Sequence, residues 1–334
     1  MRVLVTGATG YIGSHSVVEL LAHGHEIIGV DNYCNSSPTV ADRIREVVGS
    51  DAPFEMHELD LCDVAATDAL FAATEPDAVI HFAGLKAVGE SITEPLRYDQ
   101  VNLGSTMSLG AAMKNHGVDR IVFSSSATVY APTDVLPLRE DAPTGPINPY
   151  GRTKLFIEDM LRDWADAYGW RVICLRYFNP VGAHASGRLG EAPGGVPANL
   201  APYMLSVASG EREVLSIYGD DYPTEDGTCR RDYVHIVDLA EGHAAAIEAL
   251  DEPGWEVINL GTGNPTSVFE ALHAANRAVG FEINHKIVDR RPGDAPDSYA
   301  DASLAKQRLG WTAERTIDEM FTDAWRWEQV RRTL

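Results

Sequence analysis

The stretch Arg2-Val3-Leu4-Val5-Thr6-Gly7-Ala8-Thr9-Gly10-Tyr11-Ile12-Gly13 decides the fold of this 334-residue chain. Its first five residues form an apolar run that predicts a short buried strand, and the residues from about Ile12 to His23 predict a helix. The glycines Gly7, Gly10 and Gly13 allow a tight turn whose backbone N–H groups can approach a pyrophosphate. Such a turn between a first strand and a first helix predicts a dinucleotide-binding unit.

Apolar runs alternate with helical segments along the following residues. Further strands are expected at Glu26–Val30, Phe54–Leu59, Ala78–Phe82, Ile121–Ser124 and Arg171–Leu175. Strands that alternate with helices build βαβ units and a parallel sheet. The fold class expected is α/β: a Rossmann-type doubly wound parallel sheet with a smaller C-terminal substrate-binding α/β lobe.

The composition changes after Asn179, where loops rich in glycine and proline begin. Such loops often carry the residues that bind substrate. The sequence therefore predicts an NAD-binding domain over residues 1–178 and a substrate-binding lobe over residues 179–334. A strand near residues 256–260 is expected to return to the first domain, and Ile317–Val330 is expected to be helical.

The composition excludes several classes of protein. A formal net charge of −22 argues against nucleic acid as a partner. No window of eighteen apolar residues predicts a membrane span, and no signal region is expected at the N-terminus. The spacing of the four cysteines fits no metal site, and isolated cysteines favour a reducing, cytoplasmic location. The cysteines are Cys34, Cys62, Cys174 and Cys229.

A helix is well indicated after Asn148, which can cap it, with Pro149 in its first turn and Gly169 at its end. Apolar residues then recur at helical spacing and predict the buried face: Ile157, Leu161, Trp164 and Tyr168. The helix begins with Tyr150 and Lys154, which lie on one face because they are four residues apart.

This tyrosine–lysine pair indicates redox chemistry with a nicotinamide cofactor. A tyrosine with a pKa near 10 is a poor base at neutral pH. Lys154 and an oxidised nicotinamide ring would each favour the phenolate by roughly 2 kcal/mol, for a separation of about 7 Å and a dielectric of about 20. Tyr150 is therefore the candidate base. Ser124-Ser125-Ser126 follows a strand and can place a hydroxyl on the reacting oxygen, but spacing alone does not choose among the three.

Three further segments fit a dinucleotide. Asp31 closes the second strand, where a carboxylate can accept hydrogen bonds from the adenosine ribose and would repel a 2′-phosphate, so NAD is favoured over NADP. Asp60 follows the third strand as a candidate adenine contact. In Phe82-Ala83-Gly84-Leu85-Lys86, small residues allow close approach of the cofactor, and Lys86 can reach its ribose or phosphate side.

The chain resembles the extended short-chain dehydrogenases/reductases, and within them the UDP-glucose 4-epimerases. Runs such as Phe82–Ser91 and Arg176–His184 carry the resemblance, because generic dehydrogenases lack them. The other matching stretches are Gly7–His15, Asp31–Ser36, His81–Ser91, Phe123–Tyr130, Tyr150–Lys154, Leu175–Ser186, Tyr222–His235 and Asn259–Gly263.

The resemblance implies a role for individual residues. It implies that Ser126 is the catalytic serine beside Tyr150 and Lys154. It implies an NAD site lined by Tyr11, Ile12, Asp31, Asn32, Asn35, Ser36, Asp60, Leu61, Phe82, Lys86 and Phe178. The positions that it assigns to the UDP-sugar are Asn179, Asn199, Arg231, Tyr233, Arg291 and Asp294, together with Lys86, Ser126 and Tyr150.

The resemblance also implies a reaction and a partner. The reaction is the reversible C4 epimerisation of UDP-glucose and UDP-galactose, an isomerisation through a transient 4-keto sugar and tightly bound NAD. UDP would supply binding energy remote from the reacting carbon. The implied partner is a second copy of the chain, packed through a helical bundle, and no metal is implied.

Two positions depart from the family pattern. Val101 stands where the family usually has a cofactor-contacting asparagine. Ser298 stands where some members have a tyrosine that walls off the sugar 2-position. A serine leaves room for an N-acetyl group, which predicts that UDP-GlcNAc and UDP-GalNAc are also substrates.

The alternatives are a uronate epimerase, a 4,6-dehydratase or a decarboxylase of the same fold, and a non-catalytic NAD-binding sensor. Dehydratases carry an Asp-Glu pair where Ala127-Thr128 stands here. A uronate enzyme would need more positive charge around C6. Sensors of this fold typically lose the tyrosine or the lysine, and this chain keeps both.

Overall fold

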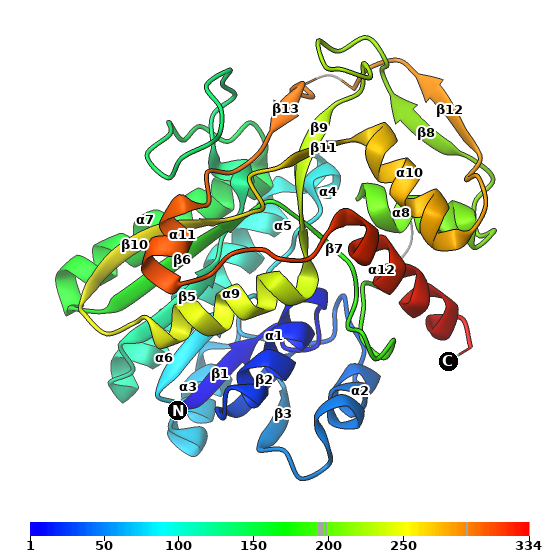
Figure 1. Ribbon diagram of the computed structural model, residues 1–334. Coiled ribbons are helices and arrows are strands. Elements are labelled where there is room, and N and C mark those ends of the chain that lie inside the picture. The colour runs from blue at the N-terminus through cyan, green and yellow to red at the C-terminus, as the bar shows by residue number, and fades with distance from the viewer. Residues whose placement is uncertain (193–196, 198, 292, 334) are drawn as a thin grey trace.

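The computed structural model describes residues 1–192, 197, 199–291 and 293–333. Its main feature is a parallel sheet in the strand order β10-β6-β5-β4-β1-β2-β3 (Figure 1). The seven strands are β1 (Arg2–Thr6), β2 (Glu26–Asp31), β3 (Phe54–Glu58), β4 (Ala78–His81), β5 (Arg120–Ser124), β6 (Arg171–Tyr177) and β10 (Gly254–Leu260). This is the doubly wound α/β sheet that the alternating pattern predicts.

The strand order reverses between β1 and β4, and this reversal positions the site. From β1 the chain moves outward to β2 and β3, and from β4 it moves the opposite way to β5 and β6. Thr6 pairs with His81, and His81 pairs with Phe123, so the ends of these three strands lie side by side. Ligands of open α/β sheets bind outside the carboxyl ends of the strands at such a reversal.

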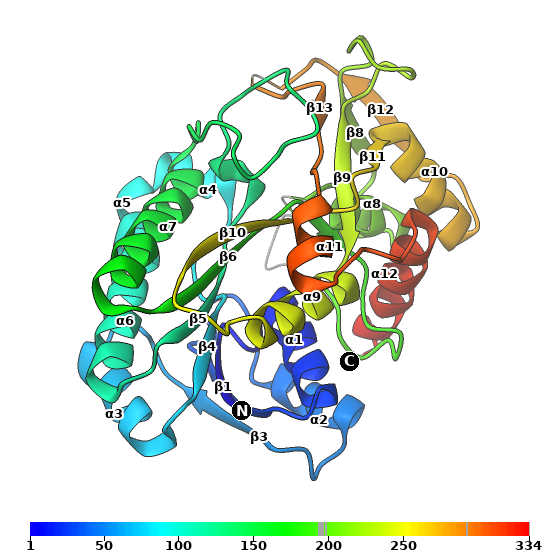
Figure 2. The same ribbon diagram turned by 60° about the vertical axis from the view of Figure 1, so that its left-hand side comes forward.

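Helices cover both faces of the sheet because its strands are apolar on both sides. Figure 2 shows α1 (Tyr11–Ala22), α2 (Thr39–Val48) and α9 (Ile236–Glu248) on one side. On the other side lie α3 (Val64–Thr74), α6 (Gly104–His116) and α7 (Pro149–Tyr168). Shorter helical elements precede α6 and α7: α4 (Val88–Thr93), α5 (Pro95–Tyr98), a π-helix (Asp99–Leu103) and a 3₁₀ helix (Ala127–Val129).

The segments after β6 build a smaller α/β unit. One small sheet joins β7 (Asn179–Val181), β9 (Arg230–His235), β11 (Pro265–Ser267) and β13 (Asp297–Ser298), and a second pairs β8 (Leu215–Tyr218) with β12 (His285–Val288). Its core lies between α8 (Leu200–Ala208), α10 (Val268–Val279) and α12 (Ile317–Arg331). The chain returns to the large sheet through α9 and β10. After it has completed the smaller sheets, it packs once more against the core of the large sheet through α11 (Ser303–Leu309).

Helix α7 begins and ends as expected, but its buried face differs from the prediction. The Asn148 side chain accepts a hydrogen bond from the Gly151 backbone N–H at 2.8 Å, and Gly169 ends the helix in the left-handed conformation. The prediction that Tyr168 belongs to the core is wrong: it is exposed, and the Lys114 ammonium lies over its ring. The stripe of buried residues instead includes the polar side chain of Glu158.

Candidate active site

The glycine turn between β1 and α1 leaves no room for side chains. Gly7 adopts a φ of +66°, and a Cβ there would lie 3.0 Å from the Ala83 nitrogen. A Cβ on Gly13 would lie 2.1 Å from the Gly7 carbonyl oxygen. Gly10 is the N-cap of α1, and within the described residues no side chain caps it, so the first N–H groups of the helix can bind an anion. This cradle fits the pyrophosphate of a dinucleotide.

The carboxylate at the end of β2 is fixed beside this turn. Asp31 accepts hydrogen bonds from the Thr9 N–H at 3.1 Å, from the Tyr33 N–H at 2.9 Å and from the Ser36 hydroxyl at 3.2 Å. Asn32 donates to Asp60 at 3.3 Å and so connects the residues that follow β2 and β3. The structure therefore brings together the side chains that the sequence assigns to the adenosine half of NAD. Asn35 lies in the same loop, and Leu61 is buried next to Asp60.

The segment after β4 is held by an asparagine that the sequence analysis did not single out. Asn102 accepts from the Leu85 N–H at 2.7 Å and donates to the Leu85 carbonyl and to the Thr153 hydroxyl. A Cβ on Gly84 would lie 3.1 Å from the Asn102 side-chain oxygen, so only glycine fits there without a shift. Its neighbour Val101 forms part of the π-helix. The backbone from Phe82 onward is thereby kept close to the glycine turn.

Lys86, which is predicted to bind the cofactor and the substrate, has a protein partner. Its ammonium lies 3.1 Å from the Glu191 carboxylate, and the lysine side chain is half exposed. Glu191 is itself held by α12, because its carbonyl accepts a hydrogen bond from the Trp327 indole at 2.8 Å. The sequence analysis did not identify Glu191, which lies 105 residues from Lys86 along the chain.

The three consecutive serines after β5 have three different partners. The carbonyl oxygen of Ser124 accepts a hydrogen bond from the Lys154 ammonium at 2.7 Å. The Ser125 hydroxyl donates to Glu158 at 2.5 Å. The Ser126 hydroxyl accepts hydrogen bonds from the Thr128 N–H at 3.2 Å and from the Thr128 hydroxyl at 3.0 Å, and it is the serine hydroxyl that acts on the pKa of Tyr150, which it lowers. Of the three, Ser126 is therefore the hydroxyl beside the predicted base.

The site is buried, and burial sets its proton affinities. Burial raises the pKa of Tyr150 well above that of a free phenol, and the hydrogen bond with Ser126 opposes this shift. Burial lowers the pKa of Lys154 to about 8, and the Glu158 carboxylate opposes this shift. The Lys154 ammonium lies 5.8 Å from the centre of the Tyr150 ring. Tyr150 can act as a base near neutral pH only if neighbouring positive charge outweighs the cost of burying the phenolate.

The residues assigned to the UDP-sugar gather around the small sheet of β7, β9, β11 and β13. Arg231 donates to the carbonyl of Ala295 at 2.9 Å and lies 3.7 Å from Asp294. Ser298 pairs with Arg231 across the β9–β13 ladder. The Arg291 guanidinium stacks 3.8 Å from the centre of the Tyr218 ring.

The other positions assigned to ligands lie on neighbouring elements. Asn179 opens β7 and donates to the Asp232 carbonyl at 2.9 Å, and Tyr233 is its partner residue on β9. Asn199 is the N-cap of α8. Phe178, assigned to the NAD site, is buried in a small apolar cluster with Val129.

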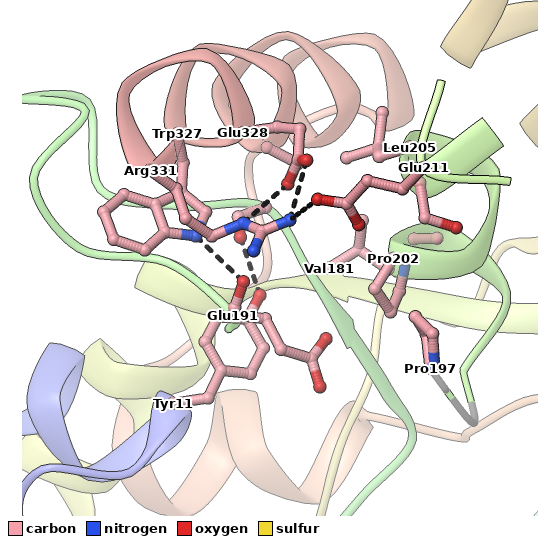
Figure 3. Close-up of a pocket in the computed structure, with 14 residues that line it drawn as sticks. Tyr11, Val181, Glu191, Pro197, Pro202, Leu205, Glu211, Trp327, Glu328 and Arg331 are labelled. Carbon is pink, nitrogen blue, oxygen red and sulfur yellow. Dashed lines mark hydrogen bonds and ion pairs between the residues drawn. The ribbon is translucent and has the colours of Figure 1, made fainter. Parts of the chain in front are cut away.

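A hollow lies between α8, α12 and the segment around Gly182, and neither Tyr150 nor Ser126 lines it (Figure 3). The Tyr11 hydroxyl donates to the Gly182 carbonyl there at 2.7 Å, and Arg331 pairs with Glu328 and Glu211 (Figure 3). Among the predicted site residues, only Tyr11 lines this hollow. The candidate active site therefore rests on the arrangement of side chains at the sheet edge and not on the size of a cavity.

Within residues 1–192, 197, 199–291 and 293–333, no group of three or more histidine, cysteine, aspartate or glutamate side chains is arranged to hold a metal ion. Across the same ranges, no helix is both long and apolar enough to cross a membrane.

These features define a class of protein: an enzyme of the Rossmann type that uses a dinucleotide for redox chemistry. They are the large parallel sheet, the glycine cradle, and the tyrosine and lysine beside a serine at the edge of the sheet. The chain belongs to the NAD dependent epimerase/dehydratase family, whose model matches residues 3–261. It is 52% identical over 330 residues to the UDP-glucose 4-epimerase of Bacillus subtilis, covering 98% of this chain and 97% of that protein. It is 51% identical over 337 residues to the human UDP-glucose 4-epimerase, covering 98% of this chain and 96% of that protein.

The fold also matches a solved structure closely. The UDP-glucose 4-epimerase from Bifidobacterium longum, crystallised in complex with NAD+ and UDP, superposes with a TM-score of 0.94. The two chains are 50% identical, and the match covers 99% of each. These relatives confirm the resemblance and the fold class expected from the sequence.

Proposed function

We propose that this protein interconverts UDP-glucose and UDP-galactose by inverting the configuration at C4 of the sugar, using NAD. The observation that carries the proposal is the contact of α7 with the serines after β5, in which Lys154 donates to the Ser124 carbonyl and Tyr150 is the neighbour of Ser126. Sequence identity of about 50% to named epimerases over nearly the whole chain supports the same activity. The assignment of individual site residues stays a prediction.

The cradle and the strand-end carboxylate would hold NAD. Backbone N–H groups from Gly10 onward would bind its pyrophosphate, and Asp31 would accept from its adenosine ribose. When bound, NAD would supply a reversible acceptor for the hydride of C4, and the residues of this site would hold the sugar within its reach. The cradle has no space for larger side chains, so the cofactor can lie against the main chain.

Tyr150 would remove the proton of the sugar 4-hydroxyl and return it after inversion. Lys154, held by the Ser124 carbonyl, would stabilise the phenolate electrostatically. Ser126 would hydrogen-bond the reacting oxygen and orient it toward Tyr150. The 4-keto sugar must rotate between the two half-reactions so that its opposite face receives the hydride. The protein must therefore hold it mainly through UDP, which the residues around β9 would bind.

The proposal is tested by incubating the purified protein with UDP-galactose, without added NAD, and resolving the products by NMR. We expect UDP-glucose to form. Parallel incubations with UDP-glucuronate and dTDP-glucose test the related activities of this fold. Formation of a dehydrated or decarboxylated product in place of the C4 epimer would contradict the proposal.

Replacing Tyr150 by phenylalanine should lower kcat by about 10²–10⁴-fold, the usual contribution of a positioned acid or base. Tyr168→Phe is the matched control, because Tyr168 lies on the same helix but is exposed. It should leave kcat unchanged. If Tyr150→Phe epimerises as fast as the unmodified protein, Tyr150 is not the base.

We further propose that two copies of the chain associate through the helices α4 to α7. Large apolar side chains are exposed on these neighbouring helices, and such clusters mark protein interfaces. They are Val88, Ile92, Leu96, Met107 and Phe156. Leu96 is the most exposed of the five, with 67% of its surface exposed.

This surface is tested by light scattering after size-exclusion chromatography. Leu96→Glu should convert a dimer into a monomer, because a charge would be buried without a partner. Phe281→Glu is the control, since Phe281 is also half exposed but follows α10 in the smaller unit. A dimer that survives Leu96→Glu and Ile92→Glu together would contradict this interface.

The cytoplasmic location stays a prediction, supported by four cysteines that are all free.

A further inference from the structure

A buried ion pair lies next to the proposed catalytic groups. Arg176 on β6 binds Glu158 on α7 through two parallel hydrogen bonds, at 2.9 Å from Nε and 2.6 Å from Nη2. Both side chains are almost completely buried, with 4% and 1% of their surfaces exposed. The guanidinium also donates to the Glu140 carbonyl and lies over the Tyr130 ring. Such a two-pronged contact fixes the carboxylate in one orientation.

Stability alone is a poor explanation for this pair. Taking two charges out of water costs several kcal/mol each, and replacing buried pairs with apolar residues is often neutral or stabilising. The pair also makes a contact outside itself. The Glu158 oxygen that accepts from Arg176 Nε also accepts from the Ser125 hydroxyl.

These contacts fasten α7 to the serine segment at three successive residues. Side chains at intervals of four residues along one face of α7 reach the segment: Tyr150 to Ser126, Lys154 to Ser124 and Glu158 to Ser125. Glu158 makes the third of these contacts, and its carboxylate is held in place by the ion pair with Arg176. Loss of the third contact should allow the segment that carries Ser126 to move relative to Tyr150.

Glu158 also provides the negative charge that faces Lys154. The Lys154 ammonium packs against the Phe123 ring at 4.7 Å and donates to a neutral carbonyl. His81 on β4 is kept neutral, because burial lowers its pKa to about 3 and the charge of Lys154 adds to the shift. The titratable groups beside Tyr150 are two phenols, Tyr177 on β6 and Tyr98 on α5, and the Tyr98 hydroxyl donates to Glu90 on α4. On its other side, Glu158 faces the Arg176 guanidinium.

We propose that Glu158, held by Arg176 and Ser125, is a positioning residue of the reaction: it keeps the Lys154 ammonium charged and keeps Ser126 aligned with Tyr150. This inference rests on the proposed function, in which Tyr150 is the base. Glu158 itself touches no reacting atom in this scheme and acts through Lys154 and Ser125.

The test is Glu158→Gln, which keeps the size of the side chain and removes its charge. Without the carboxylate, Lys154 should lose its proton at a lower pH, so the alkaline limb of kcat/KM against pH should move down by about one unit. At pH 8 this shift corresponds to a loss of up to about tenfold in kcat/KM, with KM changed less than about twofold. Ser125→Ala, which keeps the charge, should lower kcat without moving the alkaline limb.

Asp238→Asn is the matched control for the loss of a buried ion pair. Asp238 is fully buried and binds Arg315, and its other hydrogen bonds go to the backbones of Glu314 and Arg315. It should lower stability and leave the pH profile unchanged. If Glu158→Gln does not fold, Glu158→Gln/Arg176→Gln removes both charges and should show a smaller shift in the same direction.

A second readout does not depend on turnover. The titration of Tyr150 can be followed by the ultraviolet absorbance of tyrosinate, taken as the difference between each protein and its Tyr150→Phe counterpart. The titration is carried out with NAD+ added, whose positive ring would bring the pKa of Tyr150 into the range where Lys154 is charged. Tyr150 should then titrate at higher pH in Glu158→Gln than in the unmodified chain. An unmoved tyrosine titration together with an unmoved alkaline limb would overturn the positioning role. Absence of epimerisation by the unmodified protein would instead contradict the proposed function, and the tyrosine titration would still decide the role of Glu158.

Discussion

At the residue scale, the three adjacent serines show that identical side chains can have different roles, because each lies at a different position along the end of β5. Sequence spacing left all three as candidates. In the structure, Ser125 faces a buried carboxylate and Ser124 offers its carbonyl to Lys154, which leaves Ser126 beside Tyr150. The alternation of side chains along extended backbone turns Ser125 away from Ser124 and Ser126, and the Ser124 hydroxyl is hydrogen-bonded to the Tyr177 hydroxyl at 2.8 Å. It supports Ser126 as the serine that orients the sugar.

Ser298 is the residue at which substrate range should be adjustable. It lies on β13, paired with Arg231, one of the residues proposed to bind UDP. By the resemblance, a small side chain at this position would leave space for an N-acetyl group at the sugar 2-position. We therefore expect the protein to epimerise UDP-GlcNAc and UDP-GalNAc as well. Ser298→Tyr should reduce kcat/KM for the acetylated sugars at least tenfold while UDP-galactose turnover stays within a few-fold.

Ser298→Ala is the control for this prediction, because it keeps the residue small and should preserve both activities. Product formation from each substrate can be measured by NMR in competition. Equal losses on acetylated and unmodified sugars in Ser298→Tyr would mean that the added ring disturbs the site as a whole. No turnover of UDP-GlcNAc by the unmodified chain would contradict the predicted substrate range.

At the element scale, the first turn of α7 determines where Tyr150 lies. A Cβ on Gly151 would lie 2.7 Å from the Thr128 carbonyl, so the helix approaches the 3₁₀ helix as closely as backbone allows. Asn148 caps the same turn through the Gly151 N–H. This part of the site was predictable, because capping residues, Pro149 and the tyrosine–lysine spacing are all local signals.

Asn148→Ala should destabilise the protein by about 1 kcal/mol, the usual cost of losing an N-cap. Because Tyr150 lies two residues after the cap, fraying of this turn should also lower kcat. Urea unfolding and steady-state kinetics measure the two effects. Asn148→Asp keeps an acceptor and should retain both stability and activity. A variant with full stability and full kcat after Asn148→Ala would show that packing against the 3₁₀ helix holds the turn without its cap.

Other elements of the site could not be predicted from local signals. The pairing of Glu158 with Arg176 joins a helix to a strand, and Lys86 meets Glu191 from a distant loop. Helical periodicity correctly assigns Ile157 and Leu161 to the core, but it does not show that Tyr168 in the last turn is exposed, with its ring against Lys114. Glu158 follows Lys154 by four residues, and this spacing was the one available signal that it faces the site.

At the scale of the whole molecule, the alternation of strands and helices in the sequence predicts the parallel large sheet. It does not predict that the chain passes twice between the large sheet and the smaller unit. The chain leaves the sheet after β6, builds β7 to β9, and returns through α9 and β10 before completing the smaller unit. Only the apolar run near Val257 indicated this return. A single boundary at residue 178 therefore does not describe the packing, because α9, which follows this boundary in the sequence, packs beside α1 in the core of the large sheet.

The interior of the molecule holds histidines that should make it sensitive to acid. Burial lowers the pKa of His15 and His81 to about 3 and that of His243 to about 4. Each imidazole therefore stays neutral in the folded protein when the unfolded chain begins to bind protons near pH 6.5. The unfolded state then binds more protons, so the free energy of unfolding falls as pH falls.

We expect the free energy of unfolding to be constant above about pH 7 and to decrease by up to about 2 kcal/mol per buried histidine at pH 5, a range above the ordinary titration of carboxylates. Urea unfolding at pH 8, 7, 6 and 5 measures the decrease. His243→Phe should remove about a third of it, because this ring already packs between Phe82 and Tyr177 and its Nε2 has no hydrogen-bond partner in the described structure. His116→Gln, at the surface, should leave the decrease unchanged. Stability that does not change between pH 8 and pH 5 would mean that the three imidazoles gain protons without unfolding, through local opening of the sheet edges around them.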